Sequence, residues 1–323
     1  MVILMISGAI ASLVPITTTT INANAVTGGG GGAKIYDCFT FNGEWDMLQI
    51  RVLTTGFMVE KYLVCESDHS FSGSPKPKHL ELALASKKYP WLNQVADKFV
   101  IRGLTTISKS SWENEGNTRL LWRDMLHDLS ATANGKRDGA LFEGSEVTER
   151  DWVFLSDVDE IWKPHLALEL LSPHFLDSTV RFPCEVHYYN YATRHASPMF
   201  GTVAGYRWAH YRSMPSSGFR ESKGRVLQDR RSGCWHCSYC FGPTLDDAVV
   251  HVRNKLQTFS HLEYSGPPWT DTDHIKRHIT DRVDLFDRGE RFQAFADPDI
   301  DAPLIVYAVP GLAHLIRGFN HSK

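Results

Sequence analysis

Apolar runs of strand length alternate with helix-like stretches along the first half of this chain. The strand-like runs lie at residues 35–41, 57–65, 99–102 and 152–155. Between them, residues 44–53 and 112–129 carry apolar side chains three or four positions apart, the period of a helix with one buried face. Alternating strands and helices predict an α/β protein with a Rossmann-like, mostly parallel sheet and helices on both faces.

The pattern changes in the second half of the chain. Residues 179–191 and 200–211 are strand-like and rich in aromatic side chains, and no clear helix separates them. Parallel neighbours need a long crossover, so we expect these strands to form an antiparallel extension of the sheet that walls a cleft. Residues 213–231 are polar and predicted as a mobile loop, and helices are predicted at residues 245–259 and 304–319.

Three carboxylates follow directly on the fourth apolar run, in the sequence Ser156-Asp157-Val158-Asp159-Glu160. Open α/β sheets bind ligands at the carboxyl ends of their strands. Clustered carboxylates repel one another unless a cation lies between them. Mg²⁺ and Mn²⁺ suit oxygen ligands and usually arrive with a phosphate-bearing substrate. The pattern predicts a divalent-metal site at Asp157 and Asp159; the alternative is a solvated acidic turn before a helix that begins near Pro164.

Composition supports a soluble globular protein with a sizeable core, since 42% of the 323 residues are hydrophobic and 22% are charged. The net charge of −3 provides no basic surface that would favour nucleic acid. Residues 1–16 are almost wholly apolar but shorter than a comfortable bilayer span. Ala23-Asn24-Ala25 resembles a signal-peptidase site, and residues 28–32 form a glycine linker. We expect a secretory signal or membrane anchor over residues 1–33 and one folded domain over residues 34–323.

Three of the six cysteines stand close together, at Cys234, Cys237 and Cys240, with His236 among them. Zinc is one interpretation, but the chain offers no second cysteine pair. An iron–sulfur cluster lacks the usual spacing of its fourth ligand. A local disulfide or packed thiols is the other interpretation. The imidazole of His236 is a candidate ligand for Mn²⁺ bound by the carboxylates, with His261 as its rival.

Several stretches together resemble glycosyltransferase family 17, which contains the enzymes that add the bisecting GlcNAc to N-glycans along with many fungal and microbial members. The stretches occur in the family's order at residues 42–51, 64–77, 155–161, 234–241 and 255–263. The most specific is Trp235-His236-Cys237-Ser238-Tyr239-Cys240-Phe241. The chain is more similar to the fungal members than to the animal ones.

This resemblance implies a GT-A fold in which Asp-x-Asp holds Mn²⁺ or Mg²⁺ against the diphosphate of the donor. It also implies UDP-GlcNAc as donor, a mannose-containing N-glycan-like acceptor, inversion at the anomeric carbon and a home in the secretory pathway, in the Golgi membrane. The matching positions imply Asp157, Asp159 and His236 as metal ligands, with Glu44, Glu66, Arg119 and Asp157 near the donor nucleotide.

Departures from the family are few. Cys234 replaces a usual glycine, Trp162-Lys163-Pro164 replaces a frequent Pro-Arg, and Gln49 replaces a common glutamate. None of these positions is an expected metal ligand.

The implied mechanism is a single displacement in which a carboxylate removes the proton of the acceptor hydroxyl. Glu263 is the first candidate for this base, and Asp246 and Glu185 are the others. Three alternatives stay open from the sequence: a metal-carboxylate phosphohydrolase or nucleotidyltransferase, a glycan-binding protein without catalysis, and a zinc-stabilised interaction module around residues 234–240.

Overall fold

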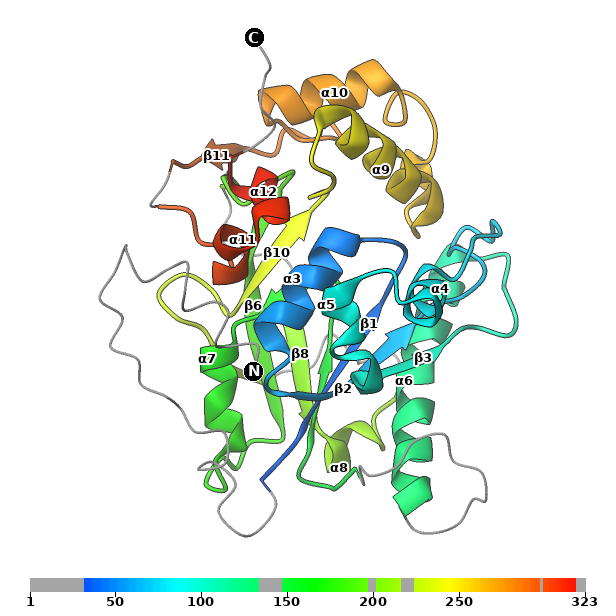
Figure 1. Ribbon diagram of the computed structural model, residues 1–323, viewed down its shortest axis with the longest axis vertical. Coiled ribbons are helices and arrows are strands. Elements are labelled where there is room, and N and C mark those ends of the chain that lie inside the picture. Colours follow the sequence, from blue (N-terminus) through cyan, green and yellow to red (C-terminus); the bar gives the residue numbers. More distant parts are fainter. Residues whose placement is uncertain (1–31, 134–146, 197–201, 216–223, 297–298, 318–323) are drawn as a thin grey trace.

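The computed structural model describes residues 32–133, 147–196, 202–215, 224–296 and 299–317. In this part of the chain a twisted sheet forms the centre of the molecule, and helices cover both of its faces (Figure 1). Its main path runs β11-β7-β6-β8-β4-β1-β2-β3. The predicted α/β fold is confirmed.

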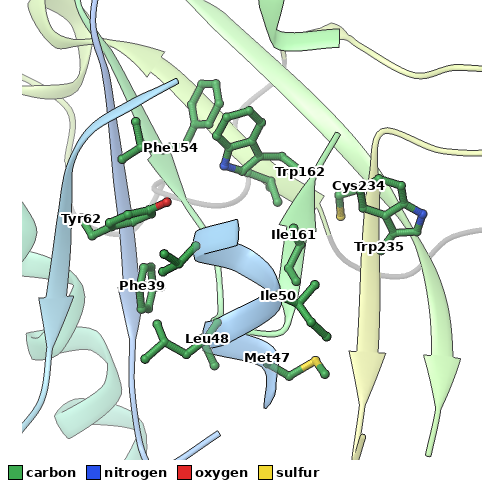
Figure 2. Packing of buried hydrophobic residues seen from close by; sticks show 14 of the residues in the cluster. Phe39, Met47, Leu48, Ile50, Tyr62, Phe154, Ile161, Trp162, Cys234 and Trp235 are labelled. Atoms are coloured by element: carbon green, nitrogen blue, oxygen red, sulfur yellow. The ribbon is translucent and has the colours of Figure 1, made fainter. Parts of the chain in front are cut away.

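Four parallel strands form the first half of the sheet: β1 (Ile35–Thr40), β2 (Val59–Cys65), β3 (Phe99–Arg102) and β4 (Trp152–Leu155). Successive residues of β1 face opposite sides, as the pleat requires. Ile35 and Phe39 join the core that contains α3 (Trp45–Thr55), whereas Tyr36 and Cys38 join the core that contains α6 (Ser111–Ala133). Figure 2 shows the first of these cores, to which Phe39 of β1 and Met47 and Leu48 of α3 belong.

The predicted antiparallel extension is confirmed. β8 (Thr202–Arg207) pairs antiparallel with β4 on one side and with β6 (Thr179–Tyr188) on the other. β10 (Cys234–Ser238) pairs parallel with β6 and antiparallel with β5 (Glu160–Trp162). The smaller strands are β7 (Thr193–His195), β9 (Arg225–Val226) and β11 (Phe292–Ala294).

Two predicted boundaries in the second half were wrong. The strand expected to reach residue 211 ends at Arg207, because its partner β4 begins at Trp152, opposite Arg207; the chain then turns into α8 (Trp208–Tyr211). The single helix expected over residues 304–319 is broken into α11 (Leu304–Ala308), η5 (Pro310–Leu312) and α12 (His314–Arg317). Pro310 cannot donate a helix hydrogen bond, so it ends the first piece.

Two helices of the second half lie near the carboxyl end of β10 (Figure 1). α9 (Leu245–Thr258), which was predicted, packs against α10 (Thr272–Asp281), which was not. The remaining helices are short: α4 (His79–Ser86), α5 (Pro90–Asn93), η1 (Ala96–Lys98), α7 (Pro164–Ala167), η2 (Leu168–Leu171) and η4 (Leu262–Tyr264). No helix in the described ranges is both long and apolar enough to cross a bilayer, and the predicted anchor lies mostly outside those ranges.

The cysteine cluster consists of disulfides. Cys237 bonds to Cys240 within the cluster, and Cys234 bonds to Cys184, its direct neighbour across β10 and β6. This outcome matches the disulfide interpretation and leaves no thiolate of the cluster to bind zinc. Cys38 and Cys65 are free and buried.

Candidate active site

A pocket of about 320 Å³ opens where the parallel strands end. The ends of β1 and β2 and the residues after β1, β2 and β4 line it from the sheet side. β10, α6, α9 and the segment after α9 contribute the rest. Glu44, Asp157, Asp159, His236 and Lys255 all line this pocket. Arg119 lines it as well, so the fold brings five of the predicted site residues together from segments far apart in the sequence.

Arg51 of α3 holds the loop that carries the acidic motif. Its guanidinium is fully buried and pairs with Asp37 of β1, at 2.8 Å from Nε to Oδ2 and 2.5 Å from Nη2 to Oδ1. The same group donates to the carbonyl oxygens of Asp157 and Glu160, both at 2.9 Å, and to Ser156 Oγ at 2.6 Å. One buried cation therefore fixes both ends of the motif at the sheet edge.

Glu160, the third acid of the motif, supports the backbone and does not line the pocket. Its carboxylate accepts the N–H of Asp157 at 3.0 Å, and its side chain is buried. Of the three acids of the motif, only Asp157 and Asp159 therefore line the pocket.

Asp159 lies between two basic groups. Its Oδ2 accepts a hydrogen bond from Lys255 Nζ at 2.9 Å, and its Oδ1 lies 3.8 Å from His236 Nε2. Burial acts to raise the pKa of this carboxyl, but the ammonium of Lys255 and the nearby imidazole of His236 outweigh burial and the pKa is lowered. Asp159 is therefore held as a carboxylate.

Lys255 received no role from the sequence, although it begins one of the stretches that resemble family 17. The N-cap Thr244 starts α9 by accepting the N–H of Asp247 at 3.2 Å, and this helix carries Lys255 to the pocket near its other end. The ammonium lies over the rings of Tyr239 and Phe241, 5.4 and 5.7 Å from their centroids. Burial opposes its charge, yet Asp159 and Glu44 raise its pKa, so Lys255 stays protonated.

The predicted metal ligands suit a divalent ion that shares its shell with a substrate. His236 Nδ1 is buried and has no hydrogen-bond partner among the described residues. His236 Nε2 lies 2.9 Å from Ser238 Oγ and 3.8 Å from Asp159 Oδ1. The second distance is too long for a hydrogen bond, but two ligands each about 2.1 Å from one ion can lie that far apart.

The carboxylates of Asp157 and Asp159 and the imidazole of His236 do not form a closed cage, however. Among the described residues, the one group of three such side chains with ligand atoms all within 4.8 Å lies elsewhere. An open set of this kind fits Mn²⁺ or Mg²⁺, which are held by one or two carboxylates together with phosphates of the substrate.

Of the residues expected near the nucleotide, Glu66 alone does not line the pocket. Glu44 lines the pocket, accepts the N–H of Asn42 at 2.8 Å, and has its pKa raised by burial against the opposing charge of Lys255. Glu66 is buried outside the pocket lining, where it accepts the N–H groups of Leu80 at 2.8 Å and of Glu81 at 3.0 Å and so caps α4. Arg119 lines the pocket.

Arg119 pairs with Glu115, one turn earlier on α6, and not with the acidic motif. Glu115 also accepts a hydrogen bond from Ser260 Oγ and lines the pocket. The sequence analysis did not single out Glu115; the signal available was its position four residues before Arg119 on a predicted helix.

None of the three candidate bases lines the pocket. Glu263 is exposed but binds His261 Nδ1 at 2.8 Å, and His261 does line the pocket. Asp246 is exposed and pairs with Lys276 at 2.8 Å. Glu185 is buried; burial acts to raise its pKa, but hydrogen bonds and charge from His187 and Arg194 lower the pKa to about 2.

Comparison with known proteins adds one match. The family model described as Glycosyltransferase family 17 matches residues 29–297 of the chain, a range that includes every residue lining the pocket. The search among curated proteins gave no match.

Proposed function

Because this chain belongs to glycosyltransferase family 17, we propose that it is a metal-dependent, inverting enzyme that moves GlcNAc from UDP-GlcNAc to a mannose-containing, N-glycan-like acceptor. The observation that carries this proposal is Asp159, a buried carboxylate at the carboxyl edge of the sheet with Lys255 and His236 against its two oxygens. That edge is where α/β sheets bind nucleotides.

The donor diphosphate belongs at the Asp159 end of the pocket. Asp157, Asp159 and His236 would hold Mn²⁺ or Mg²⁺, which when bound stabilises the charge that develops on the departing UDP. Lys255 contributes a positive charge that is already in place, since its ammonium is fixed by Asp159 and by the rings of Tyr239 and Phe241.

We place the acceptor beside His261 and Trp112, which also line the pocket. Glu263 reaches the pocket through His261: a carboxylate bonded to Nδ1 favours a proton on that nitrogen and leaves Nε2 as an acceptor. In this arrangement His261 Nε2 takes the proton of the acceptor hydroxyl, and Glu263 orients the ring. Glu263 thus contributes to deprotonation indirectly, by orienting His261.

A secretory location also forms part of the proposal. The two disulfides support an oxidising compartment such as the secretory lumen. The anchor or signal predicted over residues 1–33 would direct the chain into the secretory pathway.

Trp112 is expected to bind the acceptor sugar. Its side chain is 54% exposed, lines the pocket, and meets the ring of His261 edge-on at 4.6 Å. Trp112→Ala should raise the acceptor KM about 2- to 10-fold with little change in kcat, because stacking contributes about 0.5–1.5 kcal/mol to binding. The measurement is initial rate against acceptor concentration at saturating donor. Phe57→Ala, which removes an exposed aromatic ring outside the pocket, is the control; equal KM values in both variants would contradict the assignment.

A donor screen tests the proposed function directly. Free UDP is measured from a set of nucleotide sugars with Mn²⁺, with and without N-glycan acceptors. We expect release from UDP-GlcNAc to rise at least tenfold when a mannose-containing acceptor is added, and to stop when Mn²⁺ is chelated. If the amount of free UDP were the same with and without acceptor, the phosphohydrolase alternative would be favoured. Acceptor binding without turnover would favour the glycan-binding alternative.

A further inference from the structure

A second cluster of potential ligands lies away from the pocket, on α10 and the segment that follows it. One ligand atom each from His274, His278 and Asp287 lies within 4.8 Å of the other two. The histidines are one helical turn apart, so both face the same side of α10, and their rings stack with centroids 3.8 Å apart. None of the three residues lines the pocket.

Backbone carbonyl groups orient both rings. His278 Nδ1 donates to the carbonyl oxygen of His274 at 2.6 Å, and His274 Nε2 donates to the carbonyl oxygen of Leu285 at 2.9 Å. A carbonyl oxygen can only accept, so each of these nitrogens carries a hydrogen. In a neutral ring the other nitrogen then has a free lone pair, and this is how metal-bound histidines are usually oriented.

The lone pair of His278 meets a carboxylate. Its Nε2 lies 2.8 Å from Asp287 Oδ1. Two acceptors this close repel each other unless a proton lies between them or one metal ion binds both. The two rings are 7% and 2% exposed, whereas the Asp287 side chain is 63% exposed, so the site is rigid on one side and open to solvent on the other.

We propose that His274, His278 and Asp287 form a metal site distinct from the active site, and that it takes Zn²⁺. Two imidazoles and one carboxylate are a ligand set typical of zinc, whereas Mg²⁺ and Mn²⁺ prefer oxygen ligands throughout. Three protein ligands leave the fourth position to water. The ion would join α10 to the turn at residue 287, and through α10 it would brace α9, the helix that carries Lys255.

Calorimetric titration of the full chain, stripped of metal, with Zn²⁺ tests this site. The parent for the titration is Asp159→Asn, which weakens zinc binding at the pocket. We expect one Zn²⁺ per chain, with binding at least tenfold weaker after Asp287→Asn and weaker still after His278→Gln. Because the readout is binding and not activity, the result is independent of the proposed function.

His251→Gln is the matched control. His251 lies on neighbouring α9 and, like His278, uses Nδ1 to bond the carbonyl oxygen four residues earlier, here at 2.8 Å, but it has no carboxylate partner among the described residues. The affinity of the His251→Gln protein for Zn²⁺ should equal that of the parent. Asp287→Asn changes an exposed side chain, and circular dichroism checks its fold. No zinc bound to the parent, or the same affinity in Asp287→Asn as in His251→Gln, would overturn the proposal.

Discussion

Asp159→Ala is expected to lower kcat for sugar transfer by about 10³-fold or more at saturating donor, acceptor and Mn²⁺. The carboxylate is buried, is held ionised, and contacts both Lys255 and His236. Its removal takes away a predicted metal ligand and also frees the ammonium of Lys255 from its place in the pocket. Both changes act on the charge that develops as UDP departs, and a 10³-fold loss corresponds to about 4 kcal/mol of transition-state stabilisation.

Two further variants separate these causes. Asp177→Ala, which removes an exposed carboxylate 3.5 Å from Arg225 and outside the pocket, should keep normal turnover. Asp159→Asn removes the carboxylate but keeps an oxygen that can accept the hydrogen bond from Lys255. If Asp159→Ala failed only because it leaves Lys255 without a partner, Asp159→Asn would recover activity; we expect no recovery. Near-normal turnover by Asp159→Ala would refute the proposed role of this residue.

Arg51→Met is expected to lower the free energy of unfolding by about 3–5 kcal/mol. It leaves the carboxylate of Asp37 buried without its cation, and it removes the donor that holds the carbonyl groups of Asp157 and Glu160. Sugar transfer should fall as well, because the loop bearing the acidic motif loses its anchor. Chemical denaturation gives the stability, and the rate at saturating substrates gives the activity.

Two further variants measure what the buried pair of Arg51 and Asp37 contributes to stability and to activity. Asp37→Asn with Arg51→Met removes both charges and should regain part of the stability, but not the activity, since the carbonyl groups stay without their donor. Arg102→Met breaks a half-exposed pair with Asp128 and should cost at most about 1 kcal/mol. A loss below 1 kcal/mol in Arg51→Met would show that the guanidinium is not the anchor.

Local patterning was enough to predict the first half of the fold. β3 and β4 match their predicted runs residue for residue, and α3 and α6 contain nearly all of the predicted helical stretches. Such elements are defined by the alternation of apolar positions, which depends on near neighbours in sequence. The prediction failed at β8, where the length of the strand depends on where its partner β4 begins.

Some residues of the candidate site could likewise be predicted from the sequence, and others could not. Asp157 and Asp159 were identifiable from the sequence because they follow a buried strand directly, and His236 was identifiable because its stretch is unusual in composition. Arg51, Lys255 and Glu115 were missed: Arg51 and Lys255 stand at the ends of stretches that resemble family 17, and Glu115 stands four residues before Arg119, but these positions do not show which group each side chain meets. Glu66 was expected at the nucleotide but caps α4, because the helix begins beside its carboxylate.

The sequence by itself determined which residues form the central strands, where the acidic motif stands, and which family the chain resembles. Only the tertiary structure decided which charged groups contact one another and which cysteines pair. It brings Lys255 to Asp159 across 96 positions and Arg51 to Asp157 across 106, and it pairs Cys184 with Cys234 across 50. The physical reason is that periodicity records whether a side chain faces the core, whereas an ion pair or a disulfide depends on how separate elements pack in space.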